Sequence, residues 1–97
     1  MDKRHVQVIA ALVGEPVPPE DWSGVDAVLP LLERMRSEGA IVLIKLDGER
    51  TSGPYTVFVS GGPLRDAVRH DANTLEEGLA HVLGHYASRC WGVAEPG

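Results

Sequence analysis

The sequence predicts a small α+β domain in which amphipathic helices cover an antiparallel sheet of two or three strands. Three observations support this fold class. A chain of 97 residues has the usual length of one domain. Short β-branched segments separated by polar turns indicate strands joined as hairpins. Apolar residues at helical spacing before and after those segments indicate helices. We therefore expect residues 1–97 to form one domain, a two-layer sandwich of sheet and helices.

The N-terminal residues 3–13 fit two kinds of secondary structure. Their apolar residues recur at helical spacing and Gly14 is a common helix end, which favours a helix. The same residues also alternate as in a strand, so both alternatives stay open over residues 1–14. Residues 15–21 contain three prolines and are expected to form an extended connector, because proline removes a backbone donor. Trp22 then either packs onto the next helix or offers an exposed aromatic ring to a partner.

A second helix is expected over residues 23–38. Ser23 and Asp26 resemble a capping box, and five apolar residues follow on one helical stripe. Gly39 is a natural end for this helix. Pro30 lies inside the pattern and predicts a kink or a frayed first turn.

The central part of the chain predicts strands. Residues 40–46 (AIVLIKL) are β-branched and almost continuously apolar, which is typical of a strand that is covered on both faces or central in its sheet. Residues 47–54 form a polar loop, and residues 55–60 alternate as an antiparallel partner strand. Residues 64–70 are expected to form a third, edge strand, although a short helical turn also fits.

The last helix is predicted by its cap. Thr74 and Glu77 form a capping box, and apolar residues follow on one face for about four turns. Gly78 and Gly84 weaken a helix, so we expect another backbone to approach the helix closely there. Residues 93–97 are expected to form a loose tail.

No group of residues predicts an active site or a metal centre. His81 and His85 are four residues apart and are expected to face solvent as a pair, because a metal site needs further ligands. Residues 61–63 (GGP) lack the Gly-Lys-Ser/Thr ending of a phosphate loop and are expected to end a strand. The single Cys90 cannot form an internal disulfide and is expected to be a small buried hydrophobe. We therefore expect no enzyme, no cofactor and no metal.

The charge favours a protein partner over nucleic acid. Fourteen acidic and nine basic side chains give a net charge of −5. This sign repels phosphate backbones and favours a basic protein partner. No segment reaches the roughly 20 apolar residues that span a bilayer, and the N-terminal apolar run lacks a signal-peptide cleavage site. The sequence thus predicts a cytoplasmic protein without direct contact to nucleic acid or membrane.

Three segments carry a resemblance to a known class of proteins: residues 41–48 (IVLIKLDG), residues 55–62 (YTVFVSGG) and residues 74–91. With them the chain resembles immunity proteins of bacterial contact-dependent growth inhibition systems. The resemblance implies a cytoplasmic, antitoxin-like inhibitor that binds the toxic C-terminal domain of a delivered effector, often a nuclease. These proteins share no residue-level signature, so no functional residue is carried over.

We hypothesise that this inhibitor covers the active site of a basic toxin domain, with carboxylates in the places of substrate phosphates. The candidate partner-binding residues are Asp47, Glu49, Tyr55, Asp66, Asp71 and Glu76. The alternative is a small-ligand-binding domain or minor enzyme with a pocket between sheet and helices. Self-association through an edge strand is a third possibility.

Overall fold

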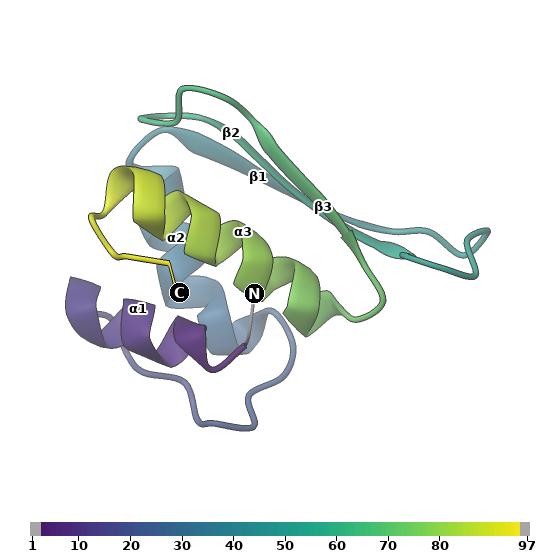
Figure 1. The fold of residues 1–97 in the computed structure, drawn as a ribbon, viewed down its shortest axis with the longest axis horizontal. Helices are drawn as coiled ribbons and strands as arrows, with labels where there is room; N and C mark the ends of the chain where they lie inside the picture. The colour runs from purple at the N-terminus through teal and green to yellow at the C-terminus, as the bar shows by residue number, and fades with distance from the viewer. Residues whose placement is uncertain (1–2, 96–97) are drawn as a thin grey trace.

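A three-stranded antiparallel sheet lies against helices in the computed structural model, which describes residues 3–95 (Figure 1). Helices α2 (Leu29–Ser37) and α3 (Leu75–Cys90) pack on one face of the sheet, and helix α1 (His5–Val13) packs on α3. The predicted α+β fold is confirmed. The core lies between the sheet and the helices and continues among the helices; its largest fully buried side chains are Trp22 and Tyr86.

The N-terminal segment is a helix, so of the two alternatives the helical one is correct. α1 ends at Gly14, whose φ of 79° is easily adopted only without a side chain. The connector after it has neither helix nor strand over residues 15–21. Trp22 is only 2% exposed, and its Nε1 donates to the Lys3 carbonyl at 3.0 Å. Lys3 Nζ donates in return to the Trp22 carbonyl. Trp22 therefore packs inside the protein and is not offered to a partner.

The second helix begins later than expected. A 3-10 helix η1 (Asp26–Val28) precedes α2, and no side chain caps either element. The predicted capping box at Ser23 is therefore wrong. The α-helix begins late because Pro30 lies in the first turn of α2. A proline is tolerated there because its missing N–H would have no intrahelical partner, whereas deeper in a helix it would remove a hydrogen bond.

The strands are β1 (Ala40–Leu46), β2 (Tyr55–Gly61) and β3 (Val68–Ala72), in the order β1-β2-β3. The expectation that β1 is central or covered on both faces is wrong, because β2 is central and β1 is an edge strand. Ile41 and Leu43 are each 57% exposed. The helices cover only one face of the sheet, so alternate residues of β1 point to the uncovered face.

The third strand also begins later than the expected residue 64. The chain first turns at Gly61 and Gly62, which have φ values of 78° and 57°, and the Leu64 N–H donates to the Gly61 carbonyl at 3.1 Å. This turn keeps residues 62–67 out of the sheet. β3 then pairs with β2 from Val68 onward.

Helix α3 has one half of the expected capping box, because Thr74 Oγ1 accepts a hydrogen bond from the Glu77 N–H at 3.1 Å. The other half is wrong: among the described residues the Glu77 carboxylate makes no hydrogen bond with the Thr74 N–H, and it lies 3.9 Å from His70 Nε2. A close approach at Gly78 exists, but to a side chain: a Cβ there would lie 2.8 Å from Val57 Cγ2. Cys90 is half-buried against the core. The expected tail is held at its start, since Val93 is buried and its N–H donates to the Ala87 carbonyl at 3.1 Å. Residues 96–97 lie outside the described residues.

Candidate partner-binding surface

The β1–β2 hairpin projects beyond the helices at one end of the molecule (Figure 1). We call residues 46–55 the hairpin arm. The Asp47 N–H donates to the Pro54 carbonyl at 2.8 Å, which extends the ladder past the last strand pair. The Asp47 carboxylate accepts the Glu49 N–H at 3.0 Å and so closes the turn, as Asp side chains commonly do.

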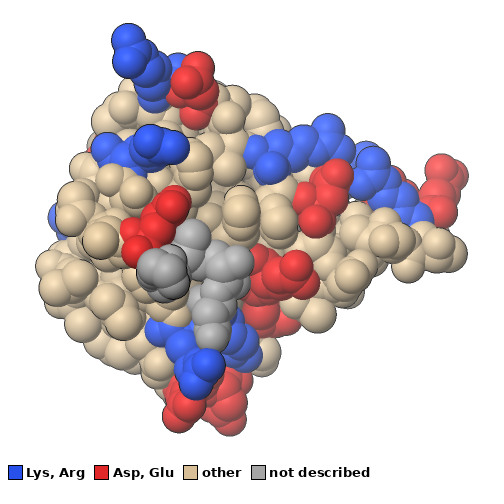
Figure 2. All heavy atoms as spheres, viewed as in Figure 1, with Lys and Arg blue, Asp and Glu red and all other residues tan. Residues whose placement is uncertain are grey.

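A network of ion pairs joins the arm to the two edge strands, β1 and β3. Asp47 lies 3.5 Å from Lys45 Nζ and 3.6 Å from Arg50 Nε. Arg50 Nη1 reaches Asp71 on β3 at 3.3 Å, and Arg69 Nε lies 3.3 Å from the same carboxylate. We call these five residues the arm network. In Figure 2 the projecting end of the molecule accordingly carries cationic and acidic side chains side by side.

The two carboxylates of the arm network are occupied by partners within the chain. The Glu49 N–H lowers the pKa of Asp47, and Lys45 and Arg50 act in the same direction. The Thr56 hydroxyl donates to Asp71 at 2.6 Å and is the largest cause of the lowered pKa of Asp71. Both carboxylates are therefore ionised at neutral pH and hold the arm in place.

The structure brings four of the six candidate residues together. Asp47, Glu49, Tyr55 and Asp71 all lie at the hairpin arm. The Glu49 carboxylate is exposed and has no hydrogen bond or ion pair with the described residues. Asp66 lies in the β2–β3 connection at the other end of the sheet. Strands of seven residues place these two ends about 20 Å apart.

Glu76 has a structural contact of its own. Its Oε2 accepts the Gly24 N–H at 2.8 Å, which fastens the segment before η1 to the first turn of α3. The same N–H is the largest cause of the lowered pKa of Glu76. Glu76 is thus separate from the hairpin arm and already serves the fold.

The uncovered face of the sheet is a feature that the sequence reasoning missed. Ile41, Leu43 and Phe58 lie on it, and Leu43 is directly opposite Phe58 in the β1–β2 register. A shallow hollow of about 190 Å³ at this place is also lined by Lys45 and Arg69 of the arm network. We call this the outer face. In the sequence, residues 41, 43 and 45 alternate along one face of the strand and so could have indicated this surface. The apolar residues between them made the segment read as continuously apolar instead.

The charge is unevenly divided between sheet and helices. Residues 40–73, which hold the three strands and their connections, contain four cationic and four acidic side chains. The net charge of −5 therefore belongs to the rest of the chain. The outer face has an apolar centre, and the arm network on its border holds three cationic and two acidic side chains.

The histidines of α3 do not form the expected solvent-facing pair. The His81 ring stacks on His70 of β3 with 3.8 Å between ring centroids and an interplanar angle of 13°. His85 is half-buried. Within residues 3–95 no group of three or more His, Cys, Asp or Glu side chains is placed to hold a metal ion. Over the same residues, none of the helices has the length and apolar character required to cross a bilayer.

None of the protein-family models, curated protein sequences or solved structures compared with the chain matches it. The resemblance to immunity proteins therefore stays a prediction.

Proposed function

We propose that this chain is a cytoplasmic protein-binding inhibitor of the immunity type, which binds a toxin domain with the hairpin arm and the outer face. The uncovered apolar centre formed by Ile41, Leu43 and Phe58 carries this proposal. Exposed apolar patches bordered by polar residues are typical of protein–protein interfaces.

The arrangement fits the anatomy of such interfaces. An apolar centre excludes water and supplies most of the affinity, while a polar border orients the partner. Leu43 and Phe58 form the centre, and the arm network forms the border. Because ion pairs already hold the arm, binding requires little additional ordering of the chain.

Charge contributes in two ways. The net charge of −5 attracts a cationic toxin domain over a distance and speeds encounter. In contact, Glu49 at the end of the arm offers a free carboxylate that can occupy a position where the toxin holds a substrate phosphate. Asp47 and Asp71 then act indirectly, because their carboxylates fix the arm that carries Glu49.

Co-expression with the product of the reading frame directly upstream tests this proposal. The wild-type chain is expected to restore growth and to co-purify with that product as a one-to-one complex. Leu43→Glu places a charge at the apolar centre and should abolish both effects. Leu12→Glu is the matched control, because Leu12 is 67% exposed but lies on α1, away from the sheet. Equal complex formation by both variants would contradict the outer face as the contact surface.

A second pair of variants tests the arm. Glu49→Gln should weaken the complex, since it removes the free carboxylate without changing the size of the side chain. Asp66→Asn is the control, because Asp66 lies at the other end of the sheet. If Asp66→Asn weakened the complex and Glu49→Gln did not, the contact would lie at the β2–β3 connection, which would contradict the proposed role of the hairpin arm.

A further inference from the structure

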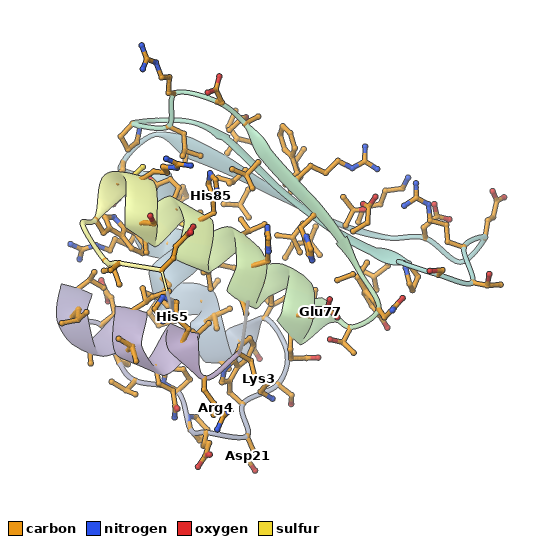
Figure 3. All side chains as sticks on the ribbon, viewed as in Figure 1. Lys3, Arg4, His5, Asp21, Glu77 and His85 are labelled. Carbon is orange, nitrogen blue, oxygen red and sulfur yellow. The ribbon has the colours of Figure 1, made fainter. Side chains whose placement is uncertain are left out.

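A hollow lies between the β2–β3 connection and the C-terminal half of α3. It has a volume of about 490 Å³ and is lined by residues 63–67 on one side and by His85 and Arg89 on the other. Figure 3 places His85 on the side of α3 that faces the sheet. Small-molecule sites commonly have volumes of about 300 to 1,000 Å³. We call this the connection hollow.

Two cationic side chains of the connection hollow are unusual because they have no partner. Within residues 3–95, Arg65 and Arg89 make no hydrogen bond or ion pair. Every other Lys and Arg residue, Arg4 included, takes part in an interaction. The engaged side chains with identified partners are Lys3, Arg34, Arg36, Lys45, Arg50 and Arg69. Both of these arginines are exposed, and both line the same hollow in an otherwise acidic protein.

The donors come from two elements of the fold. His85 and Arg89 are four residues apart on α3, so their side chains share one face of the helix. Arg65 belongs to the connection on the opposite wall. Each guanidinium has a planar set of N–H donors that matches the oxygens of a phosphate. Asp66 is the one acidic residue of the lining and can accept a hydrogen bond from a hydroxyl group of a ligand.

We propose that the connection hollow binds a small phosphorylated ligand that also carries hydroxyl groups, such as a nucleoside monophosphate. Arg65, Arg89 and His85 hold the phosphate, and Asp66 accepts a hydrogen bond from a hydroxyl. The hollow lies at the opposite end of the sheet from the hairpin arm. The inference is therefore independent of the proposed toxin contact.

Titration of the ¹⁵N-labelled full chain with AMP, with inorganic phosphate and with NaCl at matched ionic strength tests the site. AMP is expected to give saturating amide shifts confined to residues 64–67 and 85–89, and to bind more tightly than phosphate. Arg65→Gln and Arg89→Gln should each weaken AMP binding by about tenfold or more, since hydrogen bonds to charged groups are strong. Arg36→Gln is the control, because Arg36 is exposed on α2 and pairs with Glu33.

Three outcomes would overturn the proposal. Shifts that grow linearly and spread over the surface would show unspecific attraction of anions. Equal weakening by Arg36→Gln would show that overall charge, not the hollow, determines binding. Equal affinity for AMP and phosphate would overturn the hydroxyl contact with Asp66. An Asp66→Asn variant supports that contact if it weakens AMP binding and leaves phosphate binding unchanged.

Discussion

The buried Tyr86 hydroxyl donates a hydrogen bond of 2.7 Å to the Glu38 carboxylate at the C-terminal end of α2. Trp91 Nε1 donates to both oxygens of the same carboxylate at 3.0 and 2.9 Å. The Tyr86 and Trp91 rings meet edge to face, with 5.1 Å between centroids. One carboxylate thus fastens α3 and the chain after it to α2.

Tyr86→Phe should lower the free energy of unfolding by about 1 to 2 kcal/mol, because it removes a hydrogen bond to a charged acceptor and keeps the ring. Urea denaturation at pH 7 measures this difference. Tyr55→Phe is the matched control, since the Tyr55 hydroxyl makes no hydrogen bond with the described residues. Equal stability of wild type and Tyr86→Phe would contradict the role given to this hydrogen bond.

Tyr86 also predicts a loss of stability at alkaline pH. Burial, together with the Glu38 carboxylate, raises the pKa of Tyr86 above its usual value of 10. The unfolded chain therefore releases this proton at a lower pH than the folded chain. This contribution to stability is complete below pH 10 and falls above it by up to about 1.4 kcal/mol per pH unit. Between pH 9 and 11.5 the free energy of unfolding should decrease less steeply with pH in Tyr86→Phe than in wild type. Equal slopes for the two proteins would refute the assignment to Tyr86.

Gly78 lets α3 lie directly on β2. A Cβ at this position would lie 2.8 Å from Val57 Cγ2 and 3.6 Å from Ala72 Cβ. Gly78→Ala gains about 1 kcal/mol of helix propensity, but overpacking costs about 1 to 3 kcal/mol, so we expect net destabilisation. The double variant Gly78→Ala with Val57→Ala should lose less stability than the sum of the losses in the two single variants, because Val57→Ala makes room for the added methyl group. Gly48→Ala meets no atom within 4 Å and should be neutral by thermal denaturation.

The sequence was informative where local rules decide the structure. The cap at Thr74 depends on neighbours three residues apart, and the first two strands follow from β-branched segments between turn residues. Predictions failed where the outcome depends on distant parts of the chain. The exposure of Ile41 and Leu43 is determined by which face of the sheet the helices cover, and a strand's own composition does not contain that information.

The sequence predicted candidate residues for the site, but not how those residues are arranged in space. Asp47 and Asp71 were expected as free partner contacts, but Arg50 lies between them and pairs with both. Only the register of β2 with β3 brings residue 71 to the hairpin arm. Likewise, the sequence suggests that Glu76 is an exposed acidic residue at the start of a helix, whereas in the folded chain it accepts a hydrogen bond from the Gly24 N–H. These contacts join residues 21 and 52 positions apart, which a local sequence pattern does not show.

His81 predicts a loss of stability in mildly acidic solution. Burial lowers the pKa of His81 below its usual value of 6.5, and His70 and His85 act in the same direction. The unfolded chain then binds this proton at a higher pH than the folded chain. The contribution of neutral His81 to the free energy of unfolding is complete above pH 6.5 and declines as the pH falls through the lower pKa of the folded state. Melting temperatures between pH 7.5 and 5 should fall more steeply for wild type than for His81→Gln, and identical pH profiles would count against the effect.

Arg50 is the residue that links the hairpin arm to β3, through Asp47 on one side and Asp71 on the other. Arg50→Gln should leave global stability nearly unchanged, because exposed ion pairs contribute little to it. The arm itself should become looser, since its own strand ladder then remains as the main restraint. Hydrogen exchange is the suitable measurement: amides of residues 47–53 should exchange faster in Arg50→Gln, and those of β2 at Val57 and Val59 should not change. Arg36→Gln, which breaks an ion pair on α2, should leave exchange in the arm as in wild type. If exchange in the arm is equally fast in all three proteins, the ion pairs do not order it, and the preorganisation that we assign to the toxin contact has no basis.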